Sequence, residues 1–397
     1  MLRHCVAAHS QAPLAGMKTL NQWRSPQYSV VRPNGWNEPW FSRIRLTVAA
    51  EANDNINVSQ DHREEDLILR PSIQIQVSYA ITEISSLSLN LDVGYAKYIA
   101  HPENDSFVLN TEGLTGLNLD LHISRTRVNL HSEFSLEQDP VSEGEVSGRA
   151  DYRRFINASG FSIEPEYDRL HIVAGYDHIT ELYSGVFADQ NRSVESVFGQ
   201  VGRRVGDSAL YDLELGAAYI GATPGGHDQG FTYSANVQAE AQISEYLRFK
   251  AEAGYGIVQF DGSRAAFDAE NAGAFLGSLE IQNRLNRSVS QTLRVGRELL
   301  PSVRSNFRKV IYVAHRATWS VVRRVNLFSE LFYENSESSL NPGGERYDRY
   351  GAGAGVSVHL ARQLESRIDY RFTLKDSNLF GEDYSQNQAT LTLTWQF

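Results

Sequence analysis

The chain has 397 residues, of which 41% are hydrophobic and 11% aromatic, and its formal net charge is −11. This acidic balance argues against nucleic acid as a partner, because phosphate binding needs clustered positive charge. The longest apolar runs cover only a handful of residues, far short of the roughly 20 that a membrane-spanning helix needs. A lone cysteine, Cys5, excludes an internal disulfide framework.

The first forty residues differ from the rest of the chain. Residues 1–40 contain Pro, Asn, Gln and Arg and lack the continuous apolar segment of an ordinary secretory signal. We therefore expect residues 1–40 to form a poorly ordered periplasmic tail, or a short plug, attached to a single folded domain of residues 41–397.

From Phe41 onward, apolar and polar residues alternate with a period of two. Ile44, Leu46 and Val48 share one face of the first segment. The last nine residues repeat the pattern, with apolar side chains at Ala389, Leu391, Leu393, Trp395 and Phe397. A strand with one apolar and one polar face separates hydrocarbon from water across its own thickness. The alternation predicts an all-β fold, a transmembrane antiparallel up-and-down barrel. Its phase is blurred over residues 152–166, 194–204 and 306–319, where we expect bulges or lumen-facing aromatic residues.

The connections between these segments alternate between short and long. Counting segments gives about 18 strands, an even number that places both chain ends on one side. Short turns on the periplasmic side and longer external loops are typical of outer-membrane barrels, whereas a soluble propeller would show a blade repeat. We therefore expect the outer membrane of a Gram-negative bacterium, with lipid and the barrel assembly machinery as partners. Trp395 and Phe397 are the expected assembly signal.

A barrel of this size is too wide for side chains to fill, so we expect it to enclose a polar lumen. One wall is predicted to be basic, with residues from strands beside the closure seam and from a second group: Arg43, Arg45, Arg349, Arg367, Arg371, Lys375, Arg248 and Lys250. The other wall is predicted to be acidic: Asp92, Asp120, Glu133, Asp212, Glu214 and Glu240. Opposed walls would create a transverse field that orients polar solutes or guides an anionic polymer. Alternatively, the charges pair across strands and only solvate the interior.

Two aromatic residues, Phe328 and Phe332, lie in phase with the polar positions of their segment. Such rings either stack against sugars or pack against a loop folded into the barrel. Tyrosines on the outward face, such as Tyr79 and Tyr95, fit an interfacial girdle.

Enzymatic and metal-binding patterns are weak. His122, His131 and His171 lie near acidic residues, but the chain has no nucleophile elbow and no HExxH motif. The segment 53–66 loosely follows calcium-loop spacing, but Val58 stands where the sharp turn needs glycine. We expect no catalytic residue, no metal and no cofactor.

The element Asp54, Asn55 and Ile56 after the first strand, together with the terminal aromatic residue, resembles the outer-membrane porins encoded with exopolysaccharide and capsule assembly genes. The resemblance covers the layout of residues 41–397. It implies a barrel that passes a polysaccharide across the outer membrane and works with a periplasmic polysaccharide export protein.

Three hypotheses for the function follow, in descending order of support from the sequence. The first is a conduit for export of an exopolysaccharide or capsular polysaccharide. The second is a general or solute-selective diffusion porin, which usually has a long loop folded inward as a constriction, and the connections here look short for that purpose. The third is an enzyme in the lumen or the loops.

Overall fold

The computed structural model describes residues 40–109, 115–138, 144–148, 150–205, 209–222, 229–261, 268, 271–340 and 342–397. Residues 1–39, nearly all of the expected tail, lie outside this description. Within the described residues, no helix is long and apolar enough to cross a membrane.

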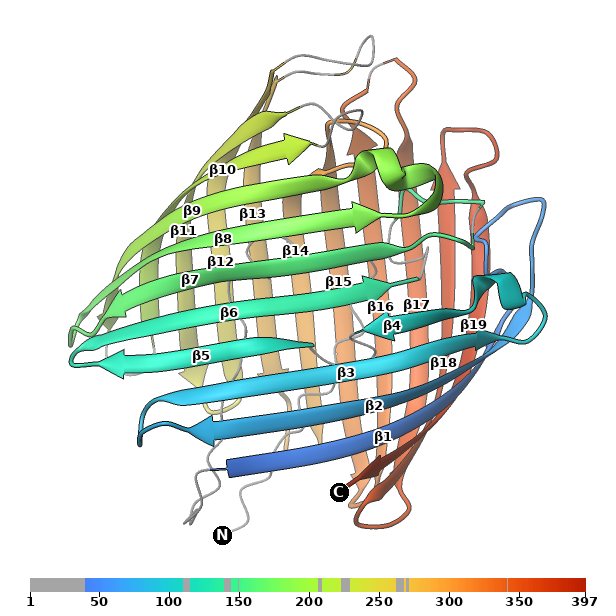
Figure 1. The fold of residues 1–397 in the computed structure, drawn as a ribbon, viewed down its shortest axis with the longest axis horizontal. Helices are drawn as coiled ribbons and strands as arrows, with labels where there is room; N and C mark the ends of the chain where they lie inside the picture. The colour runs from blue at the N-terminus through green and yellow to red at the C-terminus, as the bar shows by residue number, and fades with distance from the viewer. Residues whose placement is uncertain are drawn as a thin grey trace.

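The described chain is built almost entirely from long strands (Figure 1). The strands are β1 (Trp40–Asn53), β2 (Asp66–Ala80), β3 (Ser86–Tyr98), β4 (Ser106–Leu109), β5 (Thr115–Ile123), β6 (Thr126–Glu137), β7 (Arg154–Pro165), β8 (Leu170–Tyr183), β9 (Arg192–Val205), β10 (Ala209–Ala222), β11 (Gly230–Ser244), β12 (Leu247–Phe260), β13 (Asn271–Arg284), β14 (Val289–Pro301), β15 (Phe307–Val322), β16 (Val325–Ser338), β17 (Arg346–His359), β18 (Leu364–Ser377) and β19 (Tyr384–Gln396). Two short 3-10 helices, η1 (Pro102–Asn104) and η3 (Gly185–Gln190), lie in connections.

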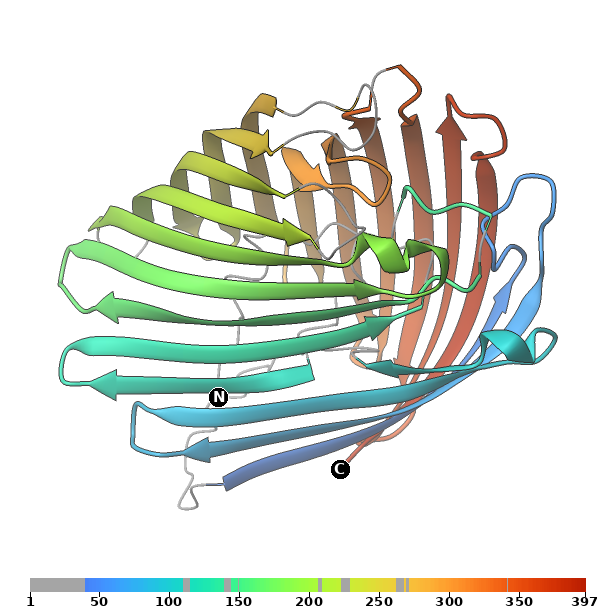
Figure 2. The same ribbon diagram turned by 45° about the horizontal axis from the view of Figure 1, so that its top comes forward.

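The strands form one closed antiparallel sheet (Figure 2). The first and last strands pair, with Leu46 opposite Trp395, and the backbone N–H of Phe397 donates to the carbonyl of Ile44 at 2.8 Å. The short strand β4 and the strand β5 both pair with β3, at different heights, and therefore share one position in the wall. The wall thus has 18 positions, as the sequence predicts. Closure leaves no strand edge unpaired in hydrocarbon.

The two faces of each strand differ as the alternation requires. In β1, Leu46 and Val48 are 42% and 54% exposed, whereas Thr47 between them is 6% exposed. In β19, Leu391 and Leu393 are similarly exposed, and Gln386 on the other face is 2% exposed. Apolar side chains therefore cover the outside of the barrel, where lipid solvates them, and polar side chains face the interior.

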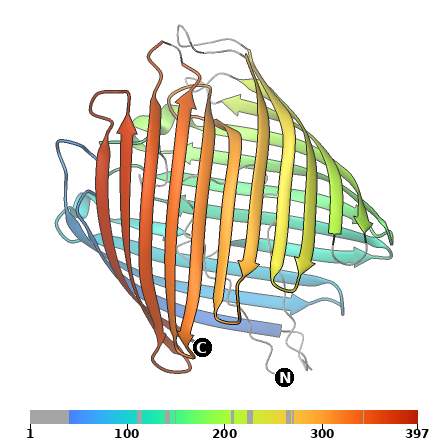
Figure 3. The same cartoon turned by 180° about the vertical axis from the view of Figure 1, so that it is seen from behind.

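The two ends of the barrel also differ. At one end the connections run from two residues (124–125) to five (81–85), and at the other from five (302–306) to sixteen (138–153). Figure 3 shows the long strands from behind, with connections at both ends. Short turns mark the periplasmic end and longer loops the external end, as expected for an outer-membrane barrel.

Bulges do not explain the blurred segments. The strands there, β7, β9 and β15, pair continuously through residues 154–165, 194–204 and 307–319. The two register shifts fall beside turns, at Gln242/Ser244 and Ser320/Val322. The phase is blurred because some apolar residues face inward: Ile156 and Val194 belong to one buried cluster inside the barrel, and Val310 of β15 is fully buried.

Candidate functional site: the lumen and the loop that crosses it

The longest connection, between β6 and β7, enters the barrel and reaches the opposite wall. Eight strand positions separate β6 from β15 in either direction, through β7–β14 one way and through β16–β19, β1–β3 and the shared β4/β5 position the other way. Even so, Glu145 of this connection contacts Arg308 of β15, with 3.6 Å between Oε2 and Nε. Residues 144–148 are called the crossing segment below.

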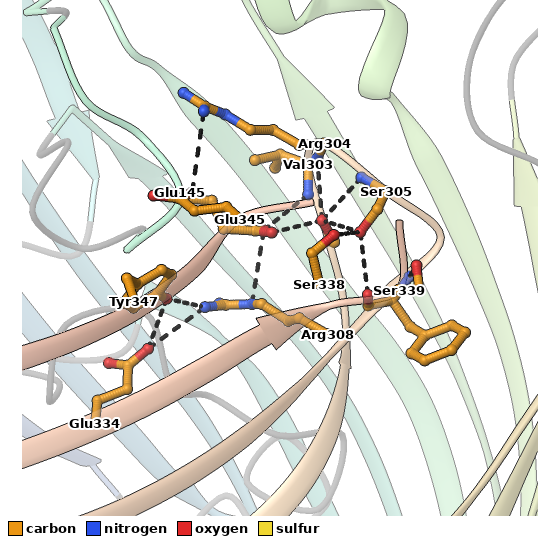
Figure 4. A network of polar contacts seen from close by, with 12 residues as sticks. Glu145, Val303, Arg304, Ser305, Arg308, Glu334, Ser338, Ser339, Glu345 and Tyr347 are labelled. Atoms are coloured by element: carbon orange, nitrogen blue, oxygen red, sulfur yellow. Dashed lines mark hydrogen bonds and ion pairs between the residues drawn. The ribbon is translucent and has the colours of Figure 1, made fainter. Parts of the chain in front are cut away.

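Two further contacts hold Glu145 in place (Figure 4). The hydroxyl of Ser302 donates to Oε1 at 2.6 Å, and the backbone N–H of Val303 donates to Oε2 at 3.0 Å. Arg308 in turn donates to the Tyr347 hydroxyl at 2.7 Å. Glu145 is 2% exposed and Val146 is fully buried. A buried carboxylate needs such donors, because an unpaired one would be strongly destabilised.

The crossing segment also touches the neighbouring connections. The Ser147 hydroxyl donates to the carbonyl of Glu382 at 3.1 Å, and Lys375 Nζ donates to Ser147 Oγ at 3.2 Å. The backbone N–H of Gly148 donates to the carbonyl of Val58, in the connection between β1 and β2. The expectation that the connections are too short to fold inward is therefore wrong. The sixteen residues between β6 and β7 are enough for the chain to reach the opposite wall.

The contacts around the crossing segment form a charge-balanced network. Its four carboxylates and four cations are Glu145, Glu334, Glu345, Glu382, Arg304, Arg308, Arg349 and Lys375. Lys375 lies 2.5 Å from Glu345, and Arg304 lies 2.8 Å from Glu382. Glu334 accepts from Arg349 and, at 2.8 Å, from the Tyr347 hydroxyl. Equal numbers of opposite charges allow the group to be buried without an unpaired ion.

Two residues of the expected basic wall, Arg349 and Lys375, belong to this network. Each is 1% exposed, so neither presents its charge to water in the lumen. Sequence periodicity places them on the inward face correctly but carries no information about burial by a distant loop.

The other residues of the expected basic wall are more open. Arg43 and Arg45 lie on the inward face of β1 and are partly exposed. Arg248 is ion-paired with Glu240, and Lys250 is exposed opposite the same residue. On β18, Arg367 donates to Asp369 at 3.1 Å. Arg371 makes no hydrogen bond or ion pair with any residue that the structure describes.

The inward acidic residues lie on the other arc of the wall, from β3 to β11. Many are paired: Asp120 with Arg127 at 2.8 Å, and Asp212 with His171 at 2.8 Å. Glu214 accepts from the side-chain amides of Gln200 and Gln238. Asp92 and Glu133 are buried, at 1% and 3% exposure. Cross-strand pairing and opposed arcs therefore coexist, and the transverse field stays a prediction.

The aromatic pair on β16 faces inward. The guanidinium of Arg367 lies 4.1 Å from the ring centre of Phe328, and that of Arg349 lies 5.6 Å from the ring centre of Phe332. Both rings are half-buried. The terminal aromatics lie on the outer face, where Trp395 and Phe397 stack with 5.7 Å between ring centres. Their role in assembly stays a prediction.

The remaining motifs have structural roles. Asn55 is fully buried, and its amide donates to the carbonyls of Ser59 and Ser385 at 2.8 Å. Asn57 likewise donates to the carbonyl of His62. These amides hold the connection between β1 and β2 together. Among the described residues, no group of three or more His, Cys, Asp or Glu side chains is arranged to hold a metal ion.

The fold matches solved outer-membrane structures from Pseudomonas aeruginosa. OccK2 (OpdF), in complex with glucuronate, matches over 90% of this chain and 98% of its own, with a TM-score of 0.53 and 11% identity. OpdQ matches over 91% and 100%, with a TM-score of 0.51 and 9% identity. The outer membrane protein OpdK matches over 90% and 99%, with a TM-score of 0.50 and 12% identity.

No family model matches the sequence, and a search of curated proteins finds no match. At such low identity the structural likeness concerns the fold alone. The fold is an 18-strand barrel of the outer-membrane porin type. Its closed wall and its apolar outer face agree with the location that the sequence predicts, the outer membrane of a Gram-negative bacterium.

Proposed function

We propose that the protein is an outer-membrane diffusion pore for small polar solutes. The observation that carries the proposal is the crossing segment, which ties the connection between β6 and β7 to the opposite wall through Glu145 and Arg308. A segment fixed across the lumen divides the passage and limits the size of what passes. The fold likeness to outer-membrane porins, one of them in complex with the sugar acid glucuronate, supports the same function.

Export of a polysaccharide, the first hypothesis from the sequence, gains no support from these comparisons. A polymer conduit needs a continuous wide passage, and a buried charge network that anchors a loop across the lumen works against one. The diffusion pore, the second hypothesis, fits better.

The proposal is tested by reconstituting the purified full chain in planar bilayers and in liposomes. We expect discrete ion-conducting channels, and swelling rates that fall steeply from monosaccharides to tetrasaccharides. A deletion strain tests the export hypothesis in parallel. If the strain retains polymer in the periplasm, and only the intact gene restores secretion, the diffusion-pore proposal is overturned.

A further inference from the structure

Four inward-facing residues lie side by side across β15–β18, and the third of them is a glycine. This glycine leaves a gap between the carboxylate of Glu330 and the guanidinium of Arg371. In register, Arg316 lies opposite Glu330, Glu330 opposite Gly353, and Gly353 opposite Arg371. Gly353 has no side chain, so one side-chain volume is missing between Glu330 and Arg371. Glu330, Gly353 and Arg371, together with the phenyl rings of Phe328 and Phe332, are called the β17 slot below.

The phenyl rings of Phe328 and Phe332 border the gap along the strand direction. Phe328 lies opposite Gly355 and Phe332 opposite Gly351, and a Cβ atom on either glycine would collide with the facing ring. At Gly353, by contrast, a Cβ atom would meet nothing closer than 3.4 Å. The rings therefore extend over the outer two glycines and leave the middle position open.

The polar groups beside the gap have bonding capacity left. One carboxylate oxygen of Glu330 accepts from Arg316 at 2.7 Å, and no hydrogen bond to the other oxygen is made by a described residue. Arg371 is partly exposed, and within the described part of the chain its guanidinium has no partner. The neighbouring Arg367 differs, because Asp369 and the Phe328 ring already hold it.

We propose that the β17 slot binds a single pyranose-sized, polyhydroxylated ring. Apolar C–H groups of such a ring can pack against the parts of the two phenyl rings that Arg367 and Arg349 leave uncovered. Its hydroxyl groups can donate to Glu330 and accept from Arg371 at the same time, because a hydroxyl both donates and accepts. The inference rests on the proposed pore function and names a solute class for it.

Binding is tested with D-glucose by ligand-observed NMR on the full chain in detergent, with the open-chain polyol sorbitol as the comparison. We expect saturable glucose binding and at least about tenfold weaker binding of sorbitol. Gly353→Val fills the slot and Arg371→Gln removes its donor, so each should weaken glucose binding by about tenfold or more.

The matched control is Gly199→Val. Gly199 lies on the outer face of β9, where a Cβ atom would meet nothing within 4 Å. Equal binding of glucose by the wild type and Gly353→Val, or equal binding of glucose and sorbitol, would overturn the slot. Arg371→Gln separates loss of binding from a folding defect, because it adds no volume to the wall.

Channel recordings separate this proposal from the pore function. If the protein conducts ions but binds no glucose, the proposed binding slot is wrong and the proposed pore function is retained. If glucose binding depends on Gly353 and Arg371 but no channel is recorded, the binding slot is retained and the proposed pore function is wrong.

Discussion

At the residue scale, the least expected feature is Glu145, a loop carboxylate buried against the far wall. Its partners are a hydroxyl, a backbone N–H and the Arg308 guanidinium. Burying such a group is favourable only when donors surround it, so its position is specific.

Replacement of Glu145 by alanine should release the crossing segment. Removing one partner of a buried ion pair costs on the order of 3 kcal/mol, because the other charge stays buried. We expect larger and noisier single-channel conductance in Glu145→Ala. The control is Glu337→Ala, which removes a pair with Arg346 whose side chains are 49% and 64% exposed. An unchanged conductance in Glu145→Ala would contradict the constriction.

Charge reversal on β18 should alter ion selectivity. Reversing a charge about 4 Å from a passing ion changes the energy of that ion by about 2 kcal/mol in water, which corresponds to about thirtyfold in permeability. For the double variant Arg367→Glu and Arg371→Glu, we expect the reversal potential in a salt gradient to shift toward cations. Arg346→Glu, on the outer face of β17, is the control. If both variants shift the reversal potential equally, the position of the β18 arginines in the lumen does not explain the change in ion selectivity.

At the element scale, the seam between β1 and β19 decides closure. The pairing runs from Arg45 and Gln396 to Asn53 and Gln388, and the N–H of Phe397 extends it to Ile44. Without this seam two strand edges would face hydrocarbon with unsatisfied backbone groups.

Phe397→Ala should lower the amount of folded barrel in the outer membrane several-fold. The ring is exposed on the outer face of the seam, where it stacks on Trp395, and losing such an aromatic pair costs about 0.5–1.5 kcal/mol. Heat-modifiable migration on gels measures the folded fraction. The matched control is Phe380→Ala, since Phe380 lies in a loop and is 98% exposed. Equal folded fractions of Phe397→Ala and Phe380→Ala would contradict the role of Phe397 in assembly.

The local alternation of apolar and polar residues predicts the strands well. It does not predict which segment crosses the lumen. The inward phase of Phe328, Arg349 and Lys375 follows from alternation alone, because a strand has a fixed period of two. The contact between Glu145 and Arg308 joins residues far apart in sequence, and no short pattern encodes it. The inward phase of Arg308 in β15 is the one signal that a search for partners could have used.

At the scale of the whole molecule, the unequal barrel ends predict its orientation. A peptide tag inserted in the turn 124–125 should stay hidden from antibody in intact cells, because short turns lie on the periplasmic side. A tag inserted beside Phe380 should be labelled. Permeabilised cells, in which both tags should react, provide the control. The opposite labelling pattern would invert the assigned orientation.

The crossing segment joins two walls that lie half a circumference apart, and this has a mechanical consequence. A cylinder with one internal tie resists becoming oval along the direction of that tie. Lateral pressure that changed the distance between β6 and β15 would load the Glu145–Arg308 contact directly. The cross-section of the barrel and the position of its constriction are therefore mechanically coupled, so the thickness and tension of the surrounding membrane become variables of permeation.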